Sequence, residues 1–204
     1  MKKLCLPLLL IACLLLTACG GREFSDAHEE LSQRLGAVEA LSFTANVRAE
    51  YENKTARFTL SYSEDSEGGS VTVLAPQLIA GVTARVKPDS TSLEYDGISL
   101  GTGDLDDYGL SPMSSLPMLV QALKTGALDS GWHEGDYTVM QINSTDTLSC
   151  TVWFQPETMI PCQAELISDG RVKVFVEISD WQEGASLPAP ETTLEEPTGD
   201  IMEY

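Results

Sequence analysis

Residues 43–62 read FTANVRAEYENKTARFTLSY, and this stretch decides the fold. Apolar and polar side chains alternate from Phe43 to Tyr51 and again from Ala56 to Tyr62. An alternation of period two is typical of a strand with one buried face. Asn53-Lys54 separates the two runs as a turn. Strands joined by a tight turn pair antiparallel, so the sequence predicts a long β-hairpin.

Further strands of this kind are predicted on both sides of a central helix. The first helix is predicted over residues 26–40, with Asp26 as its N-cap and Glu29 completing a capping box. The central helix is predicted to open at Ser111-Pro112 or at Ser115 and to end near Gly126. The remaining strands are expected at 71–74, 82–86, 93–95, 98–100, 137–143, 148–154, 160–167 and 172–181. This order predicts a mainly β (α+β) fold, with one large antiparallel sheet of about nine to eleven strands covered by the two helices.

The N-terminus reads as a signal peptide. Lys2 and Lys3 precede an uncharged apolar run from Leu4 to Ala18, which is shorter than the roughly 20 residues of a membrane-spanning helix. The run ends in Leu16-Thr17-Ala18-Cys19, which resembles the lipobox of bacterial lipoproteins. We therefore expect residues 1–18 to be cleaved and Cys19 to carry acyl chains such as palmitate. Residues 19–25 would be a short tether to the extracytoplasmic face of the cell membrane. The alternatives are an ordinary signal with a chance cysteine, or a signal anchor.

Composition limits the partners. The chain has 12 basic and 31 acidic residues and a formal net charge of −19. Nucleic acid is excluded as a partner because binding it needs a basic footprint. An acidic body is also repelled by an anionic membrane surface, so we expect it to stand off the bilayer, as a monomer. Residues 26–181 are expected to form the domain, and residues 182–204 a disordered, acidic, Pro-rich tail.

Several features follow one another in a particular order. They are the strand from Phe43 to Tyr51, Val73-Leu74-Ala75-Pro76, the hairpin 93–97, the proline-flanked central helix, the segment 152–161, and Ala164-Glu165-Leu166-Ile167 followed by Asp169-Gly170. This order of elements resembles that of the outer-membrane lipoprotein carrier and receptor superfamily (LolA/LolB/LppX-like proteins). The resemblance implies an incomplete, curved barrel with helices plugging its mouth. It also implies an apolar cavity that takes the acyl chains of lipoproteins or glycolipids.

Two hypotheses for function follow, neither of them an enzyme. In the first, an acyl chain or other apolar ligand is buried between sheet and helices, with methionines forming a deformable lid. In the second, the same side chains are a filled core, and the protein is a structural or interaction lipoprotein of the envelope that acts through a protein partner. The residues expected to line the cavity are Phe43, Val47, Tyr51, Phe58, Leu60, Met118, Leu119 and Leu123.

Cys150 and Cys162 are the two cysteines that lie within the predicted domain. If Gln155-Pro156-Glu157 is the turn of a regular hairpin, position 150 lies opposite 162, close enough for a disulfide. The alternative is two buried free thiols. A metal site is not predicted there, because no histidine is near in the sequence.

The remaining candidate sites are weak. Asp104, Asp106 and Asp107 resemble the start of a calcium loop, but Ser115 stands where a bidentate glutamate is needed, so a solvated acidic loop is the better interpretation. Neither His28 nor His133 has a nearby serine or cysteine in a known nucleophile motif. The sequence therefore predicts no cofactor, no metal and no enzymatic activity.

Overall fold

The structure, a computed structural model, describes residues 20–51, 54–87, 90–102 and 110–184. Two helices, α2 (Gly20–Ala37) and α3 (Pro112–Thr125), accompany the strands. A short 3-10 helix, η1 (Gln77–Ile79), joins β3 to β4. The strands are β1 (Ala40–Tyr51), β2 (Lys54–Asp65), β3 (Gly68–Ala75), β4 (Thr83–Lys87), β5 (Ser90–Tyr95), β6 (Ile98–Gly101), β7 (Ala127–Glu134), β8 (Tyr137–Asn143), β9 (Leu148–Phe154), β10 (Pro161–Ser168) and β11 (Arg171–Gly184).

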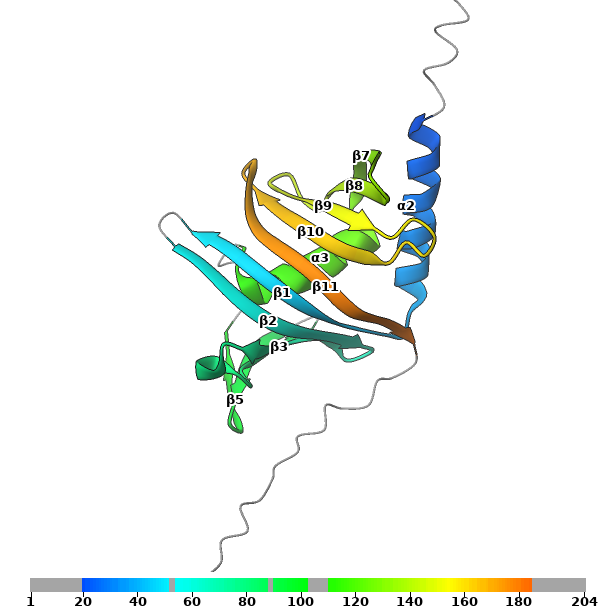
Figure 1. Cartoon of the computed structure of the whole chain (residues 1–204). Coiled ribbons are helices and arrows are strands. Elements are labelled where there is room, and N and C mark those ends of the chain that lie inside the picture. Colours follow the sequence, from blue (N-terminus) through cyan, green and yellow to red (C-terminus); the bar gives the residue numbers. More distant parts are fainter. Residues whose placement is uncertain (1–19, 52–53, 88–89, 103–109, 185–204) are drawn as a thin grey trace, which may run out of the picture.

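All eleven strands form one antiparallel sheet in the order β6-β5-β4-β3-β2-β1-β11-β10-β9-β8-β7. Strands that are neighbours in the sheet are also consecutive in the sequence, except for the central pair. In that pair the last strand, β11, lies beside the first, β1. The sheet is open, with β6 and β7 at its two edges, and α3 connects these edges by crossing one face (Figure 1). The predicted fold class is confirmed.

The hairpin predicted at residues 43–62 is confirmed, but Lys54, which was assigned to the turn, is the first residue of β2. Tyr51 lies opposite Lys54, which places Val47 opposite Phe58 and Ala45 opposite Leu60. We call the sheet face that carries these residues the inner face, and the opposite face the outer face. Helix α3 lies on the inner face and buries Leu116, Leu119 and Leu123 completely. The core is therefore a single apolar cluster between α3 and the sheet, which Leu31 and Leu35 of α2 join.

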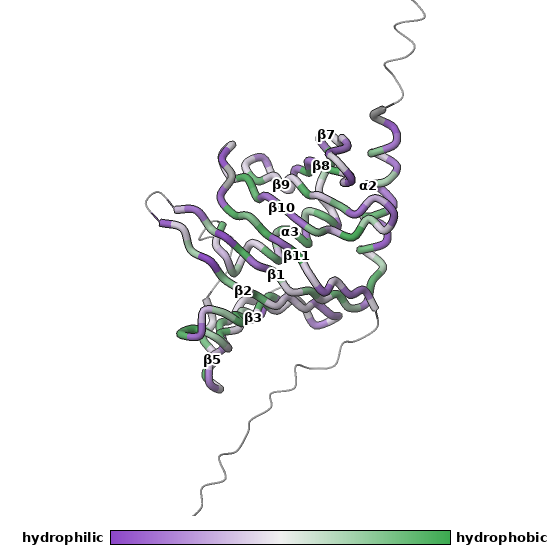
Figure 2. Tube along the Cα trace, viewed as in Figure 1, coloured by the Kyte–Doolittle hydropathy of each residue, from purple (hydrophilic) through white to green (hydrophobic). Residues whose placement is uncertain are grey.

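The central helix begins where the first of its two predicted starts places it. The Ser111 side chain accepts a hydrogen bond from the Ser114 backbone at 3.1 Å, and the Ser114 hydroxyl in turn accepts from the Ser111 backbone at 2.8 Å. Pro112 occupies the first turn, where a missing N–H costs nothing. Figure 2 shows apolar residues along α3 and strongly hydrophilic stretches along α2.

The N-terminal helix is longer at its start than the sequence predicted. It begins at Gly20 rather than Asp26 and ends at Ala37, so most of the expected tether at 19–25 is helical. The reason is Phe24, which is buried against β7 with its ring 5.1 Å from the His133 ring. Together with Leu31 and Leu35, it extends the apolar stripe of α2 by two turns. Neither helix in the described part of the chain combines the length and apolar character needed to cross a membrane.

The predicted disulfide is wrong, because residues 155–160 connect β9 to β10 in place of a three-residue turn, and the register then shifts by one further residue. Pro161 lies opposite Phe154 but Gln163 lies opposite Trp153, so Cys162 is the extra residue of a bulge. Its thiol donates a hydrogen bond to the Trp153 carbonyl at 3.2 Å. Cys150 instead lies opposite Leu166, about 13 Å along the strand from Cys162. Both thiols are free, and burial raises the pKa of Cys150 to about 12.

Candidate functional site

The residues predicted to line an apolar cavity form the packed core in this structure. Five of the eight are at most 2% exposed, namely Phe43, Val47, Leu60, Leu119 and Leu123. Phe58 and Met118 are half-buried and pack against them, whereas Tyr51 is 52% exposed. Within the residues that the structure describes, the three helix residues of this set line none of the four main pockets. The space beneath α3 is filled by the protein's own side chains.

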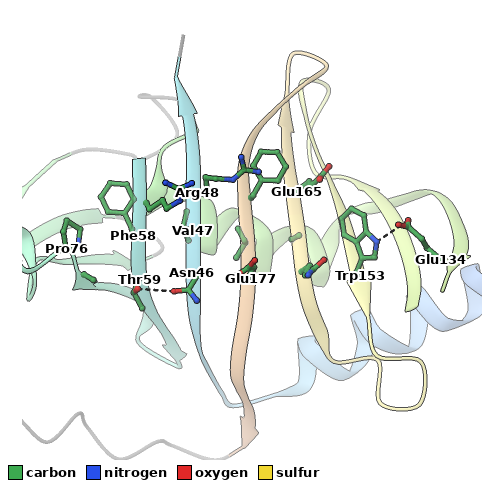
Figure 3. A pocket seen from close by; sticks show the side chains of 16 residues that line it. Asn46, Val47, Arg48, Phe58, Thr59, Pro76, Glu134, Trp153, Glu165 and Glu177 are labelled. Atoms are coloured by element: carbon green, nitrogen blue, oxygen red, sulfur yellow. Dashed lines mark hydrogen bonds between the residues drawn. The ribbon is translucent and has the colours of Figure 1, made fainter. Parts of the chain in front are cut away.

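The best-formed hollow lies instead on the outer face of the sheet. It is a groove of about 780 Å³ that runs across β2, β1, β11, β10 and β9, with the end of β3 at one limit and Glu134 of β7 at the other (Figure 3). We call it the outer groove. Its polar floor comes from the outward-facing residues of these strands, which the sequence alone indicates only as a solvated face.

One end of the outer groove is positively charged. Arg48 of β1 and Arg57 of β2 lie directly opposite each other on the outer face. The Arg48 guanidinium stacks on the Phe175 ring, 3.7 Å from its centroid, and bonds Glu50 at 2.7 Å. Arg57 has no hydrogen-bonding or ionic partner among the described residues. This end therefore presents one partly neutralised and one unneutralised guanidinium side by side.

The other end of the outer groove is negatively charged and aromatic. Glu165 lies opposite Phe175, and Glu177 lies between Asn46 and Gln163. Neither carboxylate has a partner in the part of the chain that the structure describes. Glu134 accepts hydrogen bonds from the indole N–H groups of Trp132 and Trp153, each at 3.4 Å. Acceptors and an aromatic face are thus displayed together at this end, where Glu165 lies about 14 Å from Arg57 by three strand spacings.

This arrangement suits binding rather than catalysis. A row of opposite charges around an aromatic centre can hold an extended chain that carries complementary charges. The described residues contain no group of three or more His, Cys, Asp and Glu placed to hold a metal ion. The side chains with a shifted pKa lie outside the groove. The pKa of Tyr62 is raised by burial and by the neighbouring Glu64 carboxylate, and the pKa of His28 is lowered by burial.

A second exposed surface continues the inner face beyond α3. Ile98 and Leu100 of β6 lie opposite Tyr95 and Leu93 of β5. Leu93 in turn lies opposite Ala84, which is fully buried, so all of these side chains belong to the inner face. Ile98 is 73% exposed and Leu100 is 65% exposed. The sheet therefore ends in an uncovered apolar strip, which we call the β5–β6 strip.

The sequence missed the outer groove. A two-residue turn at Asn53-Lys54 would place Arg48 opposite Thr59, whereas in the observed register, with Tyr51 opposite Lys54, Arg48 lies opposite Arg57. Like charges directly opposed on a sheet are destabilising, so such a pair indicates a site. The other predicted sites, Cys19 and the acidic loop with Asp104, Asp106 and Asp107, lie outside the described residues.

Comparisons with known proteins give structural similarity only. No family profile matches the chain, and no curated protein matches its sequence. A LolA superfamily protein from Nitrosomonas europaea is 12% identical over 80% of this chain and 94% of that chain, with a TM-score of 0.48. The lipoprotein LppX from Mycobacterium tuberculosis is 13% identical over 79% and 97%, with a TM-score of 0.37.

A third similar structure is that of the CwlD amidase from Clostridioides difficile in complex with the GerS lipoprotein. The matching chain is 10% identical over 78% of this chain and 94% of that chain, with a TM-score of 0.41. The similar structures thus include members of the superfamily that the sequence resembles. The likeness concerns the fold and not a ligand or an activity.

Proposed function

We propose that this chain is a non-enzymatic lipoprotein of the cell envelope that binds an extended segment of a partner protein in its outer groove. The observation that supports it most is the filled core. Leu116, Leu119 and Leu123 of α3 are each fully buried, so a guest beneath the helix would have to displace them. The outer groove is open without any such rearrangement, and its volume lies in the range of ordinary ligand sites.

The tether is part of the proposal. Cys19 would carry the acyl chains, and α2 follows it directly from Gly20. Two or three acyl chains hold a protein firmly to a membrane, since each buried methylene contributes about 0.8 kcal/mol. Mass spectrometry of the protein purified from its membrane should show an acylated N-terminal Cys19. A chain that keeps residues 1–18 would contradict the tether without affecting the groove.

The groove is tested by selection from a library of random nine-residue peptides on the full chain in detergent micelles. The blocking variant is Gln163→Trp, which fills the groove from an exposed outer-face position. The matched control is Ser63→Trp, on the same face but outside the groove. We expect peptides that bind the wild type and the control but not the blocked variant. If the selected peptides bind all three equally, the outer groove is not the site.

A second candidate function is supported by the β5–β6 strip. An acyl chain could lie along Ile98 and Leu100, which are apolar, exposed and continuous with the core. Apolar contact of this kind stabilises a complex by roughly 25 cal/mol per Å² of surface removed from water. A fluorescent fatty acid should then bind the wild type and not the Ile98→Asp, Leu100→Asp double variant. Equal binding by both proteins would rule out the strip.

A further inference from the structure

We infer that the partner segment in the outer groove carries an acidic residue, an apolar residue and a basic residue at positions i, i+2 and i+4. This inference rests on the proposed function and adds the chemistry of the segment. Its basis is the row of residues that crosses four strands on the outer face. In strand order the row reads Arg57, Arg48, Phe175 and Glu165.

The positive end of this row is unexplained by the fold. The chain has only 12 basic residues against 31 acidic ones, yet two of the twelve oppose each other on neighbouring strands. Their Cα atoms are about 4.5–5.5 Å apart, so the two charges repel. Glu50 offsets only Arg48, at 2.7 Å. A carboxylate placed over Arg57 and Arg48 would remove the repulsion and accept bonds from both guanidinium groups.

The negative end requires the opposite charge. Glu165 is half-buried and Glu177 is exposed, and neither has a partner among the described residues. They lie on adjacent strands, β10 and β11, on the same face as the arginines. A lysine or arginine of the segment would neutralise them. Between the two ends, Phe175 offers an apolar surface that already lies against Arg48.

The spacing follows from sheet geometry. Arg57 and Glu165 are three strands apart, which is about 14 Å at roughly 4.8 Å per strand. An extended segment advances about 3.4 Å per residue, so its charges must be four residues apart. Side chains at i, i+2 and i+4 share one face of an extended chain. When the charged ones lie over Arg57 and Glu165, the middle one lies about 7 Å from each of them, between Arg48 and Phe175, whose guanidinium and ring are stacked.

Other occupants fit the groove less well. A polyanion or an anionic membrane would meet Glu165, Glu177 and Glu134 along with the arginines. A second copy of this chain would bring a net charge of −19 against the same charge. A segment with both signs of charge satisfies both ends at once.

The test uses labelled nine-residue peptides and the full chain purified in detergent micelles, with affinity read by fluorescence anisotropy at low salt. The peptides contain Asp-Thr-Leu-Thr-Lys, Asp-Thr-Leu-Thr-Asp or Lys-Thr-Leu-Thr-Lys at their centre. We expect the first to bind at least about threefold more tightly than either of the others. Arg57→Ala should weaken it by about threefold to fivefold. Arg85→Ala, an outer-face arginine outside the groove, should leave it unchanged.

A specificity switch makes the test decisive. Glu165→Lys with Glu177→Lys should make the Asp–Asp peptide the tightest of the three, because both ends of the groove are then positive. If the wild type binds all three peptides alike, or if the Asp–Asp peptide binds best without the switch, the inference is overturned. In both cases groove-dependent peptides from the library would leave the proposed function standing. Loss of all groove-dependent binding would overturn both.

Discussion

Replacing Leu119 with alanine distinguishes a filled core from a ligand cavity. Leu119 is 0% exposed and lies on the inner side of α3. The substitution removes three carbons, worth about 2.4 kcal/mol at 0.8 kcal/mol per methylene, and leaves a cavity that adds to the loss. We therefore expect Leu119→Ala to lower the free energy of unfolding by about 3 kcal/mol. For a domain of this size, the midpoint of thermal unfolding should fall by about 6–12 °C.

The assay is thermal unfolding by circular dichroism, on the chain from residue 19 onward with Cys19→Ser to keep it in solution. Met118→Ala is the matched control, since Met118 directly precedes Leu119 in α3 but is only half-buried. It should lower the free energy of unfolding by about 1 kcal/mol, because part of the side chain already contacts water. The reasoning is refuted if Leu119→Ala shifts the midpoint by less than about 2 °C. A wild type that also binds a fluorescent fatty acid in saturable fashion would then place a ligand cavity beneath α3.

Three further predictions follow from single contacts. Burial lowers the pKa of His28, so below about pH 6.5 the unfolded chain binds a proton that the folded chain resists, and stability falls. His28→Leu should therefore raise the unfolding midpoint more at pH 5.5 than at pH 8. A thiol reagent should label Cys162 in the native protein and Cys150 only after unfolding, and a mass change on reduction would instead reveal a disulfide between them. Gly131→Ala would place a Cβ 2.4 Å from the Phe24 ring of α2. It should therefore lower the free energy of unfolding, measured by denaturant titration, by about 1–3 kcal/mol.

The sequence predicts those strands in which every second side chain is buried, so that one face meets the core and the other meets water. The β1–β2 hairpin is an example, because Val47 and Leu60 face the core while Arg48 and Ser61 face water. Strand β7 was missed for the opposite reason. Its residues show no alternation, since its contact is with α2, where Gly131 makes room for the Phe24 ring.

The register between β9 and β10 was predicted wrongly from their connection. Regular pairing across a turn at residues 155–157 places Cys150 opposite Cys162. The connection spans residues 155–160 instead, which moves Glu165 to that position, and the bulge at Cys162 moves Leu166 there in its place. Bulges depend on how the whole sheet twists, which no short segment encodes. The candidate site is not predicted because it joins residues that are far apart in the sequence. Its row joins Arg48 of the first strand to Phe175 of the last, and nothing local in the sequence indicates that these strands pair.

The net negative charge of the chain and the arginine pair in its groove favour different charges on a partner. The first acts at long range and the second at short range. At long range a partner meets a net charge of −19, which favours a basic protein and repels an acidic one. Within about 8 Å, the Debye length at physiological salt, the nearest charges decide the energy, and at one end of the groove these are Arg48 and Arg57. A uniformly acidic partner is repelled before it reaches them. A uniformly basic partner arrives but adds a third positive charge to a pair of which only Arg48 is partly neutralised, by Glu50. A partner that is basic overall and carries one acidic residue within an extended segment meets both demands, which is the same chemistry that the spacing of Arg57, Phe175 and Glu165 requires.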